Sequence, residues 1–436
     1  MAEDGEWGRR SLLRRAAVVA GVAAAAPLLG KTATAHAGSE DADTLFQAGK
    51  FERAGRMYEE IIKKDPENAH AARQRGYVGL LGNKFPEAEK YLTMALNLAP
   101  DDKQTNRLLA DCYTRQDKLS LAAPRWRAAG EEAYAEQFQA IHGTPYQVHG
   151  DVARLPWQQT DPFPLVEASI NGGPPKSFTF YTHIDSLGVS AKLAKETGLS
   201  VVAKQKIEAF GDIIWLYYGV LESFKMGGIE LRNLPVGWSE RESGGEVAPE
   251  AHDGMIGTWV FYHLLPTFDY AGRSLILRRR TPETARRARA DAARAGARPL
   301  PLWLADDHLL YTEGSVADAA ASDTGVVSLN IGGTGEQVAG ISEETAKRLG
   351  VRIDYDRPFA SFAGGQPVVA YPCYPKEVRL GDITAKGVYC YAGGKNTLGG
   401  EGFYKLAGFD HAFHKPTNIT LDFTTMNAYI ARGKAT

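Results

Sequence analysis

Cysteine is scarce in this chain of 436 residues, and neither sign of charge predominates. Three cysteines are too few for a disulfide-dense small domain or for a four-thiolate zinc site. The 50 lysines and arginines and the 52 aspartates and glutamates give a formal net charge of −2. A dedicated nucleic-acid-binding protein needs a basic surface, so no nucleic-acid partner is expected. Hydrophobic residues make up 44% of a chain long enough for about three folded domains.

Long apolar runs are absent beyond the amino terminus, so we expect no membrane span in the mature chain. Residues 1–37 have the order of an export signal. Arg9 and Arg10 precede an Ala/Val/Leu stretch at 16–29, and Ala35-His36-Ala37 follows as a small-x-small cleavage site. Paired arginines predict a twin-arginine signal and an extracytoplasmic location, secreted or periplasmic. An uncleaved N-terminal anchor is the alternative.

Two of the three cysteines flank a predicted β-hairpin. Gly381-Asp382 separates two strand-like segments and is typical of a two-residue turn. Pairing outward from that turn places Cys373 opposite Cys390. Because an extracytoplasmic compartment permits disulfides, we expect either a Cys373–Cys390 disulfide or two packed free thiols. Cys112 falls in a helical segment, where a core position is expected.

A period of 34 residues runs through the segment 41–135. The same spacing relates four sets of positions: Phe51, Phe85 and Leu119; Ala54, Ala88 and Ala122; Tyr58, Leu92 and Trp126; Ile61, Ala95 and Ala129. Pro66 and Pro100 close two of the units. This pattern resembles the tetratricopeptide repeat (TPR) and implies an α-solenoid in which each helix pair covers the next. Two roles remain open: recruitment of a protein partner, or a structural cap on the following domain.

From about residue 150 the composition changes and the sequence repeats itself. Glycine, β-branched and aromatic residues become frequent in short strand-like runs. The segment 190–198 matches 342–350, 225–229 matches 379–383, and 268–270 matches 421–423, with offsets of 152, 154 and 153 residues. Two copies of one β unit explain these matches most simply.

The layout of each copy resembles the retropepsin-like aspartic proteases in their tandem form. The resemblance implies two mostly-β lobes, 150–280 and 303–433, that face a cleft as in pepsin. The overall class is then multidomain α + β, with an Ala/Arg-rich linker helix within 281–300. Glycine-containing hairpins at Phe210-Gly211 and at Gly364 would cover the cleft. Copy one then has an apolar-apolar-glycine element, Met255-Ile256-Gly257, before its final strand at 274–277. The copy-two counterpart of this element is expected at Glu401-Gly402, with a charge where the family has an apolar residue.

The catalytic motif departs from that family. The resemblance implies Asp-Thr/Ser-Gly in each lobe, with two carboxylates that share a proton and activate a water. The matching positions carry Tyr181 and Asn330, and a phenol and an amide cannot form such a pair. Asp323, in a literal Asp-Thr-Gly, is expected in the turn before a strand at 326–330. Asp185 lies too close to the following helix to match the motif.

Other chemistry remains possible at these positions. Tyr181, His183 and Asp185 alternate, and a continuing strand would point all three the same way. Such a cluster could run acid–base chemistry near neutral pH. Alternatively, they only hold a non-catalytic cleft together. The remaining candidate residues could hold an oxyanion, a peptide carbonyl or a ligand backbone: Asn330, Thr182, Gly332, Gly333 and Thr334.

Three functions therefore stay open. The first is a degenerate protease that binds a peptide or small molecule in its cleft and recruits a protein through the repeats. The second is a biosynthetic enzyme that acts on a small molecule, and the third is an aspartic endopeptidase with unusual residues. His411 and His414 are three residues apart, but no second ligand cluster accompanies them, so no metal is expected. No phosphate-loop or dinucleotide fingerprint is found, so no cofactor is expected.

Overall fold

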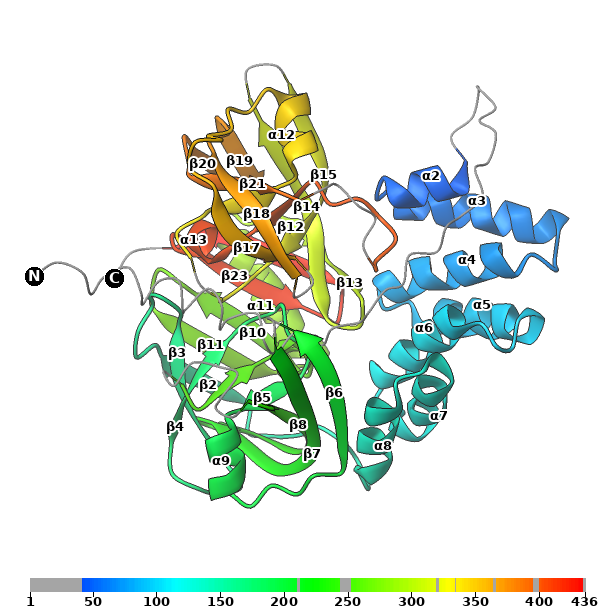
Figure 1. Cartoon of the computed structure of the whole chain (residues 1–436), viewed down its shortest axis with the longest axis vertical. Coiled ribbons are helices and arrows are strands. Elements are labelled where there is room, and N and C mark those ends of the chain that lie inside the picture. The colour runs from blue at the N-terminus through cyan, green and yellow to red at the C-terminus, as the bar shows by residue number, and fades with distance from the viewer. Residues whose placement is uncertain are drawn as a thin grey trace, which may run out of the picture.

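An N-terminal helical region is followed by a β-rich region of three sheets, so the protein is a multidomain α + β chain (Figure 1). The computed structural model describes residues 41–209, 212–243, 252–318, 321–333, 335–363, 366–394 and 400–433. Figure 1 places the helices, in blue and cyan, along one side of the stacked sheets. The predicted export signal at 1–37 lies outside the described residues. No described helix is long and apolar enough to cross a membrane.

The helical region occupies residues 42–140. Its helices are α2 (Ala42–Gln47), α3 (Phe51–Lys64), α4 (Ala69–Leu81), α5 (Phe85–Leu98), α6 (Lys103–Thr114), α7 (Leu119–Ala129) and α8 (Glu132–Ala140). The side chains of Asn68 and Asp102 cap α4 and α6 by accepting from backbone N–H groups. Ala54, Ala88 and Ala122 are fully buried where helices cross, because only a small side chain fits there.

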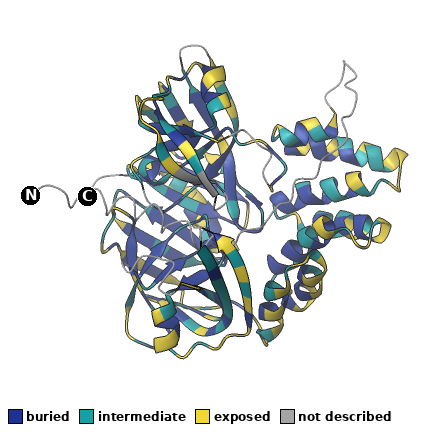
Figure 2. Ribbon diagram, in the orientation of Figure 1, coloured by how far each residue is buried: buried dark blue, intermediate teal, exposed yellow. Residues whose placement is uncertain are grey.

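Helices α3, α4 and α8 pack against the β region. The hydroxyl of Tyr77 in α4 donates to the carbonyl oxygen of Glu401 at 3.1 Å, and Gln137 in α8 donates to that of Gly219 at 2.8 Å. Phe51 meets Trp303 and Phe403 edge-on, with ring centroids 5.0 and 5.1 Å apart. Figure 2 shows exposed residues, in yellow, at the ends of the helices that lie away from the β region. This part of the repeat surface therefore caps the β region, while recruitment of a separate protein stays a prediction.

A buried arginine takes part in the contact between the helical region and the β region. Arg115, at the end of α6, donates from Nε to Asp111 at 2.8 Å and forms a second bond to the other carboxylate oxygen. It also donates to the carbonyl oxygen of Leu80 at 2.9 Å and to Asn83 at 3.3 Å. Its own carbonyl oxygen accepts from the hydroxyl of Tyr262 in the β region, at 3.1 Å.

The β region has two lobes, each built on one sheet. Lobe 1 contains β1 (Gln147–His149), β3 (Leu165–Ile170), β4 (Lys176–Phe180), β5 (Leu187–Val189), β6 (Ala203–Ala209), β7 (Asp212–Met226), β8 (Ile229–Arg241) and β9 (Gly254–Ile256), with helices α9 (Ala191–Glu196) and α10 (Thr258–Tyr262). Lobe 2 contains β13 (Trp303–Ala305), β14 (Leu309–Ala317), β15 (Ser322–Leu329), β16 (Ala339–Ile341), β17 (Phe359–Ala363), β18 (Gln366–Cys373), β19 (Glu377–Leu380), β20 (Ile383–Lys386), β21 (Cys390–Gly393) and β22 (Ala407–Phe409), with α12 (Glu343–Leu349) and α13 (His411–His414).

A third sheet joins the lobes. It contains β2 (Val152–Pro156), β10 (Leu264–Asp269), β11 (Ser274–Arg279), β12 (Pro299–Pro301), β23 (Thr417–Asp422) and β24 (Asn427–Arg432). Helix α11 (Pro282–Arg294) connects the lobes. Thr267 and Thr420 are 153 residues apart, lie opposite each other in β10 and β23, and share a hydroxyl–hydroxyl bond of 2.8 Å. Because β10 and β23 have this same offset, the threonine pair marks an internal two-fold axis.

The lobes repeat one strand pattern. In lobe 1, β9 pairs parallel with β4 and antiparallel with β5. In lobe 2, β22 pairs parallel with β15 and antiparallel with β16. The copy-two counterpart of Met255-Ile256-Gly257 is therefore Gly408-Phe409-Asp410, 153 residues on, and the expectation of Glu401-Gly402 is wrong. An apolar-apolar-glycine pattern is too short to identify the counterpart at Glu401-Gly402 reliably. The strands that pair with the element are also needed.

The hairpin register around Gly381-Asp382 matches the sequence prediction, because Leu380 pairs with Ile383 and Cys373 pairs with Cys390. Both cysteines, and Cys112, are free and buried. Burial raises the pKa of Cys112 and of Cys390 to about 12, and raises that of Cys373 further.

Thiol titration should reflect this burial. Because the thiolate is the reactive species, we expect no thiol of the folded protein to react rapidly with Ellman's reagent at pH 8. Three should react once the protein is unfolded in guanidinium chloride. A count of one in the unfolded protein would instead establish the Cys373–Cys390 disulfide.

Candidate functional site

The two lobes meet through a pair of short loops that follow β4 and β15. Tyr181 forms an antiparallel bridge with Gly332. The hydroxyl of Thr182 donates to the carbonyl oxygen of Leu329 and accepts from the backbone N–H of Ile331, each at 2.9 Å. The backbone N–H of Thr182 also donates to the carbonyl oxygen of Ile331 at 3.0 Å. These cross-lobe bonds fix residues 181 and 330 on either side of the lobe interface.

Glycine is required where the loops approach. Gly332 has φ +84°, and a Cβ atom there would overlap the carbonyl oxygen of Phe180. Gly333 has φ +74°, and a Cβ atom there would lie 2.8 Å from the ring of Tyr181. The backbone N–H of Gly332 donates to the hydroxyl of Tyr270 at 2.9 Å, and that hydroxyl lies 3.3 Å from Nδ1 of His411. His411 is therefore connected to the loop through the hydroxyl of Tyr270.

Four side chains gather at this interface. The rings of Tyr181 and His183 stack with centroids 5.6 Å apart. Nδ2 of Asn330 donates to Oδ1 of Asp410 at 2.7 Å, and the Asn330 side chain also bonds to His183. Asp410 directly follows β22, and the backbone N–H of Asn330 donates to the carbonyl oxygen of Phe409 at 2.9 Å. The amide thus links an imidazole from lobe 1 to a carboxyl group from lobe 2.

Burial shifts the pKa values of these groups in different directions. It raises the pKa of the Asp410 carboxyl to about 7, although the bond from Asn330 opposes the shift. Burial, together with the nearby charges of His308 and Lys405, lowers the pKa of His183 to about 4. Burial and the Asp410 charge raise the pKa of Tyr181. At neutral pH His183 is therefore neutral and Tyr181 protonated, while Asp410 is the group that changes charge.

Stability should depend on pH through Asp410. The pKa of an aspartate is near 3.9 in an unfolded chain and about 7 here, so the folded state binds more protons between about pH 4 and pH 7. The wild-type protein therefore loses stability as the pH rises through this window. We expect Asp410→Asn to lack this contribution, so that the variant gains Tm relative to wild type between pH 4.5 and pH 8. Thermal unfolding at three pH values measures the difference. The exposed Asp101→Asn is the control, and an equal gain there would contradict the assignment.

Asp185 does not join this cluster, contrary to the alternation predicted from the sequence. Strand β4 ends at Phe180 and the chain turns at 182–184, so the alternation of side chains is lost. Asp185 is buried, accepts the Tyr134 hydroxyl of α8 and accepts the backbone N–H of Ser186 at 2.6 Å. Its partner is thus the helical region.

Asp323 also lies elsewhere. It belongs to β15, which begins at Ser322, so the expectation that it precedes the strand in a turn is wrong. Asp323 pairs with Val316 across the ladder, and its carboxylate forms an ion pair with Arg348 at 2.7 Å. Thr324 and Gly325 continue the same ladder. The prediction failed because a three-residue motif does not by itself specify a loop.

The predicted flap hairpins are formed by β6–β7 and β17–β18, and β6 and β17 are the last strands in their sheets. Phe210, Gly211, Thr334 and Gly364 lie outside the described residues. His414 is fully buried near His411, and within the described ranges no group of three or more metal-ligating side chains is found.

Asp410 was missed by the sequence analysis, although a signal for it exists. Gly257 and Asp410 are related by the same 153-residue offset that relates β10 to β23. Applying that offset to the whole of copy one would have placed a carboxyl group beside Asn330. Tyr134 and His308 carry no comparable signal, because no motif or repeat links them to the β copies.

One family model matches the chain, the tetratricopeptide repeat, over residues 40–103. Residues 40–103 are tetratricopeptide repeats. No curated protein matches the chain. Helices α6, α7 and α8 follow the matched residues in the structure, and TPR modules commonly mediate protein–protein contacts. The β-rich region is not assigned to a family by these comparisons.

Proposed function

We propose that the β region is a tandem retropepsin-like pair of lobes whose cleft binds an extended peptide and does not perform aspartic proteolysis. The repeated strand pattern and the cross-lobe bonds of Thr182 and Ile331 support this family. Tyr181 and Asn330 stand at the two loop positions where the resemblance implies aspartates. A small-molecule ligand in the same cleft is the nearest variant of this proposal.

The observation that carries the proposal is the isolation of Asp410. The side chain that it bonds is the amide of Asn330 at 2.7 Å. The two aspartates that could complete a dyad have other partners, since Asp185 bonds Tyr134 and Asp323 pairs with Arg348. Aspartic proteolysis needs two adjacent carboxyl groups that share one proton, so a single carboxyl bonded to an amide does not supply it.

Edge strands support peptide binding. Strands β6 and β17 each end the strand order of their sheet, and each belongs to a hairpin. An edge strand presents unpaired N–H and C=O groups, which an extended peptide can pair with by strand addition. Backbone pairing needs no catalytic side chain, so binding can persist where the catalytic motif has changed.

A defined library of unmodified octapeptides tests the proposal. The full chain is incubated with the library at pH 5 and pH 7, and retained peptides are identified by mass spectrometry. We expect a subset to be retained intact. Tyr181→Phe and His183→Ala should retain the same subset within about threefold, because backbone pairing dominates. Retention of no peptide, or recovery of cleaved peptides, would contradict the proposal.

A second candidate is supported by the pKa of Asp410. A carboxyl group with a pKa of about 7, linked through Asn330 to His183, can act as a general acid–base near neutral pH. This acid–base role favours an enzyme that acts on a small molecule. Its test compares metabolite mixtures incubated with wild type and with Asp410→Asn. A product that forms only with wild type would favour this candidate over binding.

We also propose that the protein is exported by the twin-arginine route, on the pattern of Arg9 and Arg10. Replacement of both by lysine should leave the protein in the cytoplasmic fraction. Unchanged export of that variant would contradict the proposal.

A further inference from the structure

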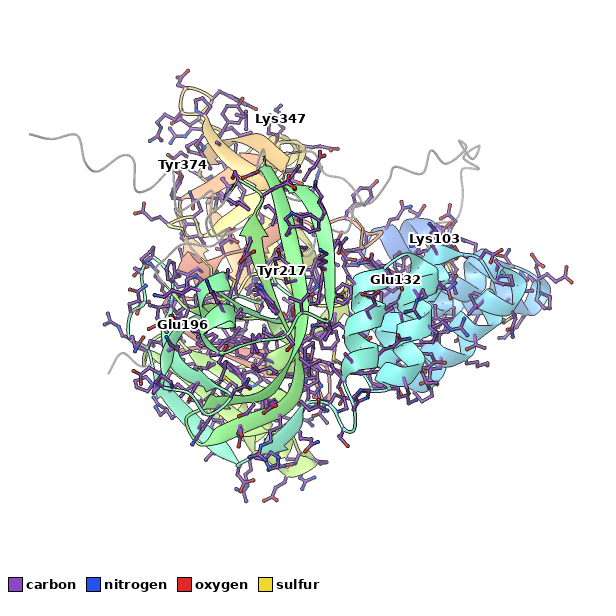
Figure 3. All side chains as sticks on the ribbon, turned by 60° about the horizontal axis from the view of Figure 1, so that its bottom comes forward. Lys103, Glu132, Glu196, Tyr217, Lys347 and Tyr374 are labelled. Carbon is purple, nitrogen blue, oxygen red and sulfur yellow. The ribbon has the colours of Figure 1, made fainter. Side chains whose placement is uncertain are left out.

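A pocket lies where the helical region and the two lobes converge. The helical region contributes Arg107 of α6 and Tyr134 of α8, and lobe 1 contributes Tyr218 of β7. Lobe 2 contributes the turn between β13 and β14, at residues 306–308. In Figure 3 Glu132 marks the helical side of this junction and Tyr217 marks the long strands of lobe 1. We call it the junction pocket.

A buried histidine lines the junction pocket. Asp307 and His308 are 7% and 8% exposed, and a carboxylate oxygen of Asp307 bonds Nδ1 of His308. No hydrogen bond to Nε2 of His308 is found among the residues that the structure describes, and the ring lines the pocket. Asp307 raises the pKa of His308 to about 9 against the effect of burial, so Nε2 carries a proton at neutral pH. Because His308 lines the pocket, an acceptor from a ligand in the pocket can bond to this nitrogen.

Negative charge exceeds positive charge around the junction pocket. Arg107 forms ion pairs with Glu131 at 2.8 Å and with Asp306 at 3.5 Å. Asp307 is paired with His308, whereas Asp185 accepts from the Tyr134 hydroxyl and forms no ion pair within the described part of the chain. Four carboxylates thus accompany two cations. A cationic group of a ligand would reduce this excess.

The walls of the pocket suit an ammonium group that continues into a peptide. The rings of Tyr134 and Tyr218 lie side by side with centroids 5.8 Å apart, and aromatic faces attract cations. Gln205 and Ile207 of the edge strand β6 also line the pocket. A chain that begins here can therefore run along β6 by backbone pairing. The charge of His308 also lowers the pKa of His183, the imidazole at the lobe interface.

We propose that the junction pocket binds the amino-terminal residue of the peptide in the cleft. The ammonium group faces the carboxylates of Asp306 and Glu131, and the first carbonyl oxygen accepts from Nε2 of His308. This inference rests on the proposed function and specifies its ligand as a peptide with a free amino terminus. The TPR region then has a direct part in recognition, because it supplies Arg107, Glu131 and Tyr134.

Three small probes separate the possible sources of the cation. Norleucine N-methylamide carries an α-ammonium group, Nα-acetyl-norleucine N-methylamide carries none, and Nα-acetyl-lysine N-methylamide carries only a side-chain ammonium. Binding to the full chain is measured by saturation-transfer NMR at millimolar concentrations. We expect norleucine N-methylamide to bind about tenfold more tightly than either acetylated probe, a difference of about 1.4 kcal/mol.

Substitutions in the junction pocket test whether the probe binds there. Asp306→Asn combined with Glu131→Gln should weaken binding of norleucine N-methylamide about tenfold, since two facing carboxylates are lost. Asparagine tolerates the positive φ of 48° at position 306, so the turn should persist. The exposed Glu67→Gln on the helical region is the matched control and should change nothing. Equal binding of the acetylated norleucine probe, preference for the lysine probe, absence of binding, or an unaffected double variant would each overturn the inference.

The library experiment distinguishes this inference from the function on which it rests. If octapeptides with acetylated amino termini are retained as well as free ones, peptide binding stands and the amino-terminal pocket is wrong. If norleucine N-methylamide binds as expected but no octapeptide is retained, the pocket stands and the peptide-binding function is wrong.

Discussion

Replacement of Arg115 by methionine is expected to lower the free energy of unfolding by about 3–5 kcal/mol. The guanidinium is fully buried and bonds both oxygens of Asp111, the carbonyl oxygen of Leu80 and the amide of Asn83. Methionine fills similar volume but leaves the buried Asp111 carboxylate without its cation. Breaking one side of a buried ion pair costs far more than an exposed pair contributes.

Urea unfolding followed by far-ultraviolet circular dichroism measures this loss. Arg127→Met is the control, because Arg127 forms an exposed ion pair with Glu132 and should cost at most about 1 kcal/mol. Asp111→Leu combined with Arg115→Met should recover most of the loss, since no charge is then left buried. A loss for Arg115→Met no larger than for Arg127→Met would contradict the central place of Arg115 between the TPR region and the β region.

Gly332→Ala is expected to cost about 3 kcal/mol or more. A non-glycine residue at φ +84° costs about 1–3 kcal/mol by itself. The new methyl group would also overlap the carbonyl oxygen of Phe180, so the two loops must separate. Separation would break the bridge to Tyr181 and weaken the bonds of Thr182, so the contact between the two loops would be lost.

Gly387→Ala separates the cost of backbone strain from the cost of steric overlap. Gly387 has φ +59° and no neighbouring atom within 4 Å of a built Cβ, so alanine there adds backbone strain without overlap. We expect it to cost about 1–2 kcal/mol. Chemical denaturation of both variants gives the difference. Equal losses would mean that the loops are not held as closely as the lobe interface requires.

Regular features of the chain could be predicted from sequence because each depends on local spacing. The 34-residue period fixes which alanines are buried at helix crossings, and Ala54, Ala88 and Ala122 are all fully buried. The turn at Gly381-Asp382 fixes the pairing of Cys373 with Cys390. Strand and helix periodicity express geometry that repeats within a few residues, so one sequence is enough to find them.

The candidate site was only partly predictable, because its contacts join distant segments. Asn330 and Asp410 are 80 residues apart in sequence, and Tyr134 and Asp185 are 51 residues apart. The alternation of Tyr181, His183 and Asp185 implied a shared direction, but β4 ends at Phe180 and the following turn sends Asp185 to α8. A pattern with period two holds only while the strand continues.

Peptide cleavage tests the central claim most directly. An octapeptide retained by the protein is incubated with the full chain from pH 3 to pH 8, beside the Asp410→Asn variant, and followed by mass spectrometry. The lone carboxyl of Asp410, bonded to Asn330, predicts that the peptide stays intact with both proteins at every pH. Cleavage with an acidic optimum that Asp410→Asn abolishes would contradict this, and would mean that Asp410 works with a second carboxyl group as an aspartic peptidase.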